Sequence, residues 1–174
     1  MEKTIYKVIV GLGNPGQQFY NNRHNSGFLV IDAVAEILGS SWKSKENMEL
    51  ATIQYNGRSL LLIKPQTFMN NSGQIWPYLA KQGIKPEEML IIHDELELPF
   101  GRVTLKVGGS AKGHNGLKSF IAYAGDGFAR VRFGIGRPVQ KEFVPTYVLQ
   151  NFREPKDALE SAIAEAVALI MALI

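Results

Sequence analysis

Two polar groups in this chain follow short apolar runs with the composition of buried strands. Asn14 comes after Val8-Ile9-Val10 and a glycine-rich turn, and Asp94 comes two residues after Met89-Leu90-Ile91-Ile92. The carboxyl ends of strands in an open α/β sheet meet at one crevice, so we expect these side chains to lie close together. His24, in the loop that returns from the turn, is expected to join them.

A histidine, a carboxylate and several carboxamides form a set that can activate water. His24 is the natural general base, because an unperturbed imidazole has a pKa of about 6.5. Asp94 would fix the tautomer of that ring and stabilise its protonated form, and Asn14 would orient water or substrate. Loops that could reach the same crevice carry Asn70, His114 and Asn115. A thiol nucleophile is excluded because the chain has no cysteine, and the G-x-S-x-G serine motif is absent.

Simpler interpretations of these residues stay open. A single histidine among asparagines can be a hydrogen-bonding loop residue, and Asp94 could cap a turn. The three histidines, with Glu95 or Glu97, could bind zinc. An H-E-x-x-H or similar spacing is absent, however, so we expect no metal and no other cofactor.

Two large apolar side chains, Phe68 and Met69, interrupt a polar loop. They are expected in the core. The polar residues around them nevertheless leave room for one of the two to face a cleft, where an aromatic ring can stack on a base.

The turn at residues 11–16, GLGNPG, spells the dinucleotide fingerprint G-x-G-x-x-G. That motif works by placing a pyrophosphate on a helix that begins at the third glycine. Residues 17–22 have no helical apolar stripe, so we expect a loop there. A nicotinamide-dependent oxidoreductase is therefore a weaker hypothesis, and a helix directly after Gly16 would be needed to support it.

The charge of the chain is unevenly distributed. Residues 102–141 hold eight basic residues and one acid, a net charge of +7, whereas the rest holds eleven basic and fifteen acidic residues, a net charge of −4. A basic segment of this kind indicates contact with a polyanion or, alternatively, a solvated surface. A non-catalytic RNA-binding domain is thus a second hypothesis. Without a membrane-length apolar run or a signal-peptide core, the chain is expected to be cytoplasmic.

The order of apolar patterns predicts one domain over residues 1–174, of α/β class, with a twisted mixed β-sheet flanked by helices. Strands are expected at 8–10, 49–55, 58–63, 89–92, 102–107 and 131–135, and Asn56-Gly57 predicts a hairpin turn. Helices are expected at 28–38, from 71 or 72 to about 82, at 117–124 and at 154–174. Pro77 should shorten or bend the second of these helices.

Five motifs together resemble the bacterial-type peptidyl-tRNA hydrolase family: GLGNPG with RHNSGF, IKPQTFMNNSG, HDELELPFG, GHNGLKS and RFGIGRP. The resemblance runs from Val8 to Phe152. It implies a single α/β domain that cleaves the ester between a peptide and the terminal ribose of tRNA. The implied partner is peptidyl-tRNA, through its acceptor stem, CCA end and peptide. The implied protein is a metal-independent, cytoplasmic monomer with no obligate protein partner.

The resemblance also implies roles for single residues. His24 matches the base that activates water, Asp94 the aspartate that supports it, and Asn14 the asparagine that distinguishes N-blocked from free aminoacyl groups. The matches to substrate contacts are Phe19, Phe68, Asn70 and Asn115, and the phosphate clamp falls near Lys106 and Arg132. Phe19 stands where the family usually has tyrosine, so a hydroxyl is missing there.

Overall fold

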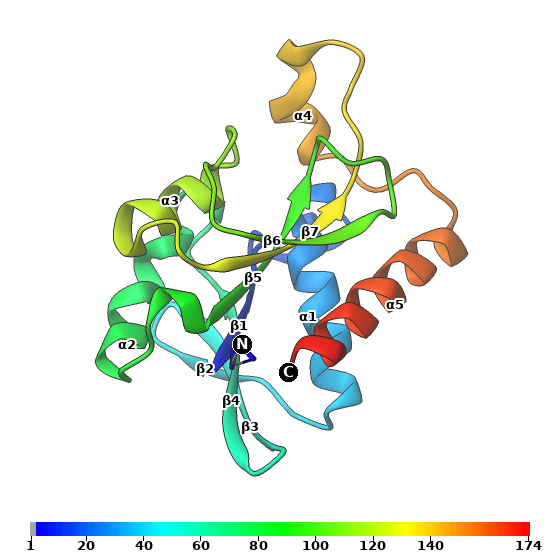
Figure 1. Cartoon of the computed structure of the whole chain (residues 1–174). Coiled ribbons are helices and arrows are strands. Elements are labelled where there is room, and N and C mark those ends of the chain that lie inside the picture. Colours follow the sequence, from blue (N-terminus) through cyan, green and yellow to red (C-terminus); the bar gives the residue numbers. More distant parts are fainter. Residues whose placement is uncertain (1–2) are drawn as a thin grey trace.

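A mixed sheet of seven strands runs through the computed structural model, which describes residues 3–174 (Figure 1). In sheet order the strands are β2 (Lys43–Lys45), β3 (Met48–Tyr55), β4 (Arg58–Pro65), β1 (Val8–Gly11), β5 (Met89–Glu95), β7 (Ala129–Gly134) and β6 (Val103–Val107). The four strands β4, β1, β5 and β7 are parallel, and the pairs at both edges are antiparallel. The predicted α/β class with a mixed sheet flanked by helices is confirmed.

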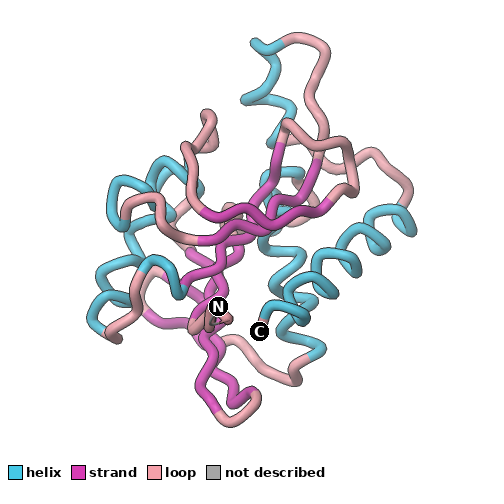
Figure 2. The backbone as a smooth tube through the Cα atoms, in the orientation of Figure 1, coloured by secondary structure: helices cyan, strands magenta, loops and turns pink. Residues whose placement is uncertain are grey.

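Helices cover both faces of this sheet, as Figure 2 shows. One face packs against α1 (Ser26–Ile37) and α5 (Lys156–Leu173), and the other against α2 (Trp76–Lys81) and α3 (Asn115–Ala124). Strand β1 is buried on both sides, since Ile9 packs in the first layer and Val8 and Val10 in the second. Burying each such side chain stabilises the fold by about 1.5–3 kcal/mol. This fixes β1 at the centre, where its carboxyl end lies beside that of β5.

The Asn56-Gly57 turn joins β3 to β4 as predicted. Both residues have positive φ, 50° and 77°, which is the conformation that a two-residue hairpin turn requires. The register pairs Tyr55 with Arg58, directly across the turn.

The segment after β4 differs from its prediction. Instead of one helix over 71–82, a 3₁₀ helix at Met69–Ile75 is followed by α2. Pro77 lies in the first turn of α2, where a missing N–H costs no intrahelical hydrogen bond, so it begins this helix rather than bending it. Strand β2 and the short helix α4 (Val144–Val148) were not predicted, because three to five residues carry too little periodicity.

Residues 17–25 form two short 3₁₀ turns, Gln17–Phe19 and Arg23–Asn25, before α1 begins at Ser26. The helix that a dinucleotide-binding turn needs directly after Gly16 is therefore replaced by a loop, and we drop the oxidoreductase hypothesis. Within residues 3–174, none of the helices has the length and hydropathy to cross a bilayer.

Candidate active site

The adjacent ends of β1 and β5 bring the predicted site residues together. Their register pairs Gly11 with Ile92, so the chain beyond each strand emerges on the same side. Helix α1 begins directly against these ends: a Cβ atom built on Gly27 would lie 2.4 Å from the Leu12 amide nitrogen and 2.5 Å from the Ile92 carbonyl oxygen. Only a glycine allows this approach, which carries the preceding turn and His24 to the end of β5.

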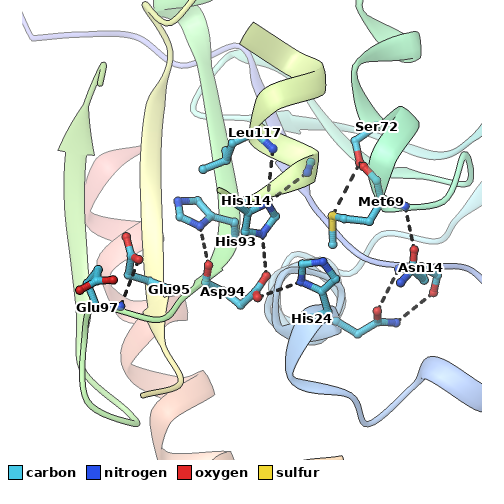
Figure 3. A network of polar contacts seen from close by, with 12 residues as sticks. Asn14, His24, Met69, Ser72, His93, Asp94, Glu95, Glu97, His114 and Leu117 are labelled. Atoms are coloured by element: carbon cyan, nitrogen blue, oxygen red, sulfur yellow. Dashed lines mark hydrogen bonds and ion pairs between the residues drawn. The ribbon is translucent and has the colours of Figure 1, made fainter. Parts of the chain in front are cut away.

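Asp94 receives a hydrogen bond from an imidazole on each of its two oxygens (Figure 3). His24 Nδ1 lies 2.9 Å from Oδ2, and His114 Nε2 lies 2.7 Å from Oδ1. The aspartate is 4% exposed. A buried carboxylate needs such partners to stay charged, so Asp94 and the two imidazole rings fix one another's orientation.

The tautomers of the two imidazoles follow from their other contacts. His114 Nδ1 accepts hydrogen bonds from the backbone amides of Gly116 and Leu117 at 3.2 and 3.3 Å, where it caps the N-terminus of α3. The ring proton therefore sits on Nε2 and is donated to Asp94, which leaves His114 without a free lone pair. His24 donates from Nδ1, so its lone pair is on Nε2, which makes no hydrogen bond to any other described residue.

The charges in this triad shift both pKa values. Burial lowers the pKa of His24, but the negative charge of Asp94 and the hydrogen bond to it outweigh that effect and raise the pKa above its ordinary value. Burial raises the pKa of Asp94, yet the electrostatic interactions and hydrogen bonds with His24 and His114 hold it well below its usual range. Asp94 is thus an anion at neutral pH, and His24 can take up a proton there.

A third imidazole, that of His93, is buried beside the triad. Its Nδ1 donates to the Asp94 backbone carbonyl at 2.8 Å, and its ring lies edge-on to that of His114 at 5.2 Å between centroids. Burial and the neighbouring His114 lower its pKa to about 3, so it is neutral. Sequence reasoning included His93 as a possible zinc ligand, and its packing role depends on contacts that no motif reveals.

Asn14 lies on the opposite side of His24 from Asp94 in Figure 3. Its Oδ1 accepts a hydrogen bond from the Met69 amide at 2.7 Å. Its own backbone amide donates to Asn25 Oδ1 at 2.9 Å, and Asn25 Nδ2 donates back to its carbonyl at 3.0 Å. The carboxamide is therefore fixed in orientation, with its NH₂ group as the part available to a ligand.

Of the two apolar residues in the polar loop, one is exposed and the other is in the core. Phe68, with φ of 61°, is 53% exposed and lies edge-to-face with the half-buried Phe19 at 6.3 Å between ring centroids. Met69 is buried between Leu12 and α3. Asn70 is exposed in the first turn of the 3₁₀ helix Met69–Ile75, and Asn115 is exposed at the first residue of α3.

A pocket of about 340 Å³ lies on the Asp94 side of His24. Its walls include His24, Asp94, His114 and Asn115, and they also hold six basic side chains: Lys106, Lys112, Arg130, Arg132, Arg137 and Lys141. The other four predicted residues, Asn14, Phe19, Phe68 and Asn70, are outside this lining. The predicted residues thus form two surfaces that meet at His24, one basic and one rich in amides and aromatic rings.

Three of these basic side chains, Lys106, Arg130 and Arg132, lie on the paired strands β6 and β7, and we call them the basic wall. Lys106 is paired with Arg130, and Thr104 with Arg132, whose Nε donates to the Thr104 hydroxyl at 3.0 Å. Arg130 is buried, and its guanidinium donates to the carbonyl oxygens of Gly109 and Ser110. It therefore fastens the loop that follows β6. The sequence showed Arg130 only as one of eight basic residues, although strand alternation from Arg132 could have placed it on this wall.

The donor atoms of His24, Asp94 and His114 lie within 4.8 Å of one another, close enough to surround a metal ion. These residues come from three distant segments, so a search for local spacing could not find the cluster. They do not fit a metal well, because both oxygens of Asp94 and both ring nitrogens of His114 are already engaged in hydrogen bonds. The His114 nitrogen that would bind the ion also carries a proton.

Comparison with known proteins identifies the family. The model of the peptidyl-tRNA hydrolase family matches residues 8–174. The chain belongs to the peptidyl-tRNA hydrolase family. It is 46% identical over 169 residues to the peptidyl-tRNA hydrolase of Bartonella henselae, which covers 96% of this chain and 88% of the relative. With that of Halalkalibacterium halodurans the identity is 47% over 161 residues, covering 90% and 87%.

Solved structures agree with this assignment. The crystal structure of the peptidyl-tRNA hydrolase from Acinetobacter baumannii superposes with a TM-score of 0.92 at 35% identity, covering 99% of this chain and 90% of that one. The resemblance seen in the five sequence motifs is thereby confirmed. A peptidyl-tRNA hydrolase is a hydrolase that acts on an ester bond, which agrees with a site that has a free imidazole lone pair.

Proposed function

We propose that this chain hydrolyses the ester between a peptide, or an N-blocked amino acid, and the terminal ribose of tRNA. His24 is the general base in this proposal, and water is the nucleophile. The observation that carries the assignment is the pair of tautomers on Asp94. Both histidines contact the carboxylate, but only His24 keeps a free lone pair, on Nε2, at the edge of the pocket. Its raised pKa keeps the ring a competent proton acceptor near neutrality.

The reaction follows from this geometry. His24 Nε2 takes a proton from water as the oxygen attacks the ester carbonyl, and the charge of Asp94 stabilises the resulting imidazolium. When the tetrahedral intermediate collapses, the same nitrogen gives its proton to the departing ribose oxygen. An ester has a good leaving group, so a base, a positioned water and amide donors suffice without a covalent intermediate.

The carboxamides would position the acyl group. The fixed NH₂ group of Asn14 can donate to a carbonyl oxygen of the bound peptide, and the exposed side chains of Asn70 and Asn115 can add further donors. The aromatic pair of Phe19 and Phe68 offers an apolar surface beside them for the peptide or the terminal base.

The basic wall would hold the tRNA. Lys106 and Arg132 line the same pocket as Asp94 and His24, so a phosphate of the acceptor stem can be paired there while the ester lies at His24. The basic surface and the amide-rich surface meet at His24, the proposed general base. This arrangement suits a substrate in which an ester joins a nucleic acid to a peptide.

The alternative of a non-catalytic RNA-binding domain explains only the basic wall. It gives no reason for a buried aspartate that orients two imidazoles. An assay that measures release of N-blocked amino acid from purified aminoacyl-tRNA, with a chelator present, separates the two hypotheses.

The decisive variants are His24→Ala and His114→Ala in that assay. His24→Ala should lower kcat by at least about 10²–10⁴-fold, because general-base catalysis is lost, while affinity for deacylated tRNA stays within about twofold. His114→Ala should lower kcat less and keep the dependence of rate on pH. Turnover that survives His24→Ala but disappears with His114→Ala would assign the base to the other imidazole and contradict the proposal.

A further inference from the structure

The turn that carries His24 is bound to a segment near the other end of the chain. Asn22 forms a β-bridge with Asn151, and its Nδ2 donates to Asn151 Oδ1 at 3.0 Å. The Arg23 amide donates to the Gln150 carbonyl at 3.0 Å. The position of the turn is therefore set by residues 147–152 as well as by α1.

The side chain of Arg23 makes the central contact between the two segments. It is 4% exposed, and its Cζ lies 3.8 Å from the centroid of the Tyr147 ring. Its NH1 group donates to the Tyr147 carbonyl at 2.9 Å and to Gln150 Oε1 at 3.2 Å. Among residues 3–174 it forms no ion pair with a carboxylate. The aromatic face and neutral oxygens therefore compensate this buried charge.

Tyr147 is itself held from two directions. Its hydroxyl donates to the Ile135 carbonyl, just beyond β7, at 2.6 Å, while its ring face receives the guanidinium. It belongs to α4, whose Val144, Pro145 and Val148 line the pocket beside His24. One short helix thus lines the pocket and also contacts Arg23, the residue adjacent to His24.

We infer that Arg23 is a positioning residue for the hydrolysis, acting with Tyr147 to hold the turn of His24 at the distance that Asp94 and the pocket require. This inference rests on the proposed role of His24. Arg23 does not line the pocket, and its guanidinium faces α4. It acts by fixing the backbone from which His24 projects. A displacement of about 1 Å at a catalytic group can cost roughly 10²-fold in rate, so loss of the Arg23 contact should lower kcat.

Lysine cannot replace arginine at this position. An ammonium group would keep the positive charge, but it lacks the delocalised planar group that contacts the Tyr147 ring while its NH1 donates to two oxygens. Arg23→Lys thus removes the positioning contact without deleting the charge, which makes it a sharper probe than an alanine substitution that leaves a cavity.

The test measures kcat and KM for N-blocked aminoacyl-tRNA hydrolysis by Arg23→Lys, Tyr147→Leu and the double variant, at a temperature where circular dichroism shows each folded. We expect kcat to fall about 10–100-fold in each single variant, with KM within about twofold. The double variant should lose no more than the worse single variant, because the two residues act through one contact.

Arg58→Lys is the matched control. Arg58 is half-buried and, like the buried Arg23, donates to a backbone carbonyl, that of Tyr6 at 2.6 Å; it lies on the hairpin away from His24. It should lower Tm without lowering kcat. The inference is overturned if Arg23→Lys keeps the parent kcat, if it raises KM at constant kcat, or if Arg58→Lys loses as much kcat as Arg23→Lys.

A His24→Asn variant in the same assay separates failure of this inference from failure of the proposed function. If His24→Asn is inactive and Arg23→Lys is fully active, His24 remains the proposed general base and the positioning role of Arg23 is overturned. If His24→Asn keeps its turnover, the proposed mechanism is wrong, and the inference about Arg23, which rests on it, is overturned as well.

Discussion

At the scale of single residues, the arrangement of charge around Asp94 decides which histidine can accept a proton. Two imidazoles approach the same carboxylate at 2.9 and 2.7 Å, and the cap that His114 forms on α3 is what makes them different. A helix N-terminus, with its free amide groups, thus takes up one lone pair and leaves the other for chemistry.

The pKa shifts predict a specific pH dependence. Because the base must be neutral, kcat should fall as the pH drops through the pKa of His24, which lies above the ordinary value of about 6.5. Asp94→Asn removes the charge that raises this pKa and leaves the burial that lowers it. The acid limb of the kcat–pH profile should therefore move to lower pH, and the maximal kcat should fall. The kcat–pH profiles of both proteins check this. A limb that stays at the same pH would mean that a different group is titrating.

At the scale of elements, the approach of α1 to the strand ends is what assembles the site. A Cβ on Gly27 would meet backbone atoms of Leu12 and Ile92 at 2.4–2.5 Å, and these atoms belong to the central strands or directly follow them. They have little freedom to move away.

Gly27→Ala should therefore lower the free energy of unfolding by about 2–4 kcal/mol, measured by urea denaturation. Gly39→Ala is the control, because Gly39 has open space around it and a φ of 66°. The strain of that backbone conformation alone should cost about 1 kcal/mol. Equal stability of the two variants would show that the contact between α1 and the strand ends is not tight.

The elements that could be predicted are those whose pattern is local. The Val8–Val10 run, the Asn56-Gly57 turn and the segment 154–174, which is strongly apolar at its end, each carry their own signal, and each lies within two residues of its predicted place. The 3₁₀ helix Met69–Ile75 packs against α3, and helix α4 packs against the Arg23–Asn25 turn, so their sequences carry no periodicity that predicts them.

The same division holds for the site. The meeting of His24 and Asp94 followed from the rule that strand ends share a crevice, and the structure brings them together. The roles of His93, Arg130 and Arg23 could not be found in this way. Each depends on a backbone oxygen or a ring supplied by another part of the fold. The roles assigned to Asn70, Asn115, Lys106 and Arg132 stay predictions, as does a monomeric state.

At the scale of the whole molecule, basic charge gathers on one edge of the sheet. Strands β7 and β6 close that edge with Lys106, Arg130 and Arg132, while β2 closes the opposite edge. A polyanion that approaches His24 from the β6 edge of the sheet contacts these basic side chains first.

Binding of deacylated tRNA should accordingly depend on salt through these side chains. Lys106→Ala and Arg132→Ala should each weaken binding and reduce the slope of log K against log salt concentration by about 1, without changing the chemical step. Lys43→Ala, on β2 at the opposite edge, should leave the slope unchanged. Fluorescence anisotropy over a series of KCl concentrations measures this. An unchanged slope for the first two variants would remove them from the contact surface.

The bridge between Asn22 and Asn151 also bears on biosynthesis. Its two halves are 129 residues apart, so the turn of His24 cannot acquire these native contacts until Asn151 has been synthesised. Throughout that time the growing chain is itself esterified to a tRNA, the kind of linkage that the finished protein is proposed to cut. If the proposed roles of His24 and Arg23 hold, a chain that has not yet closed this contact should hydrolyse the ester more slowly than the folded protein.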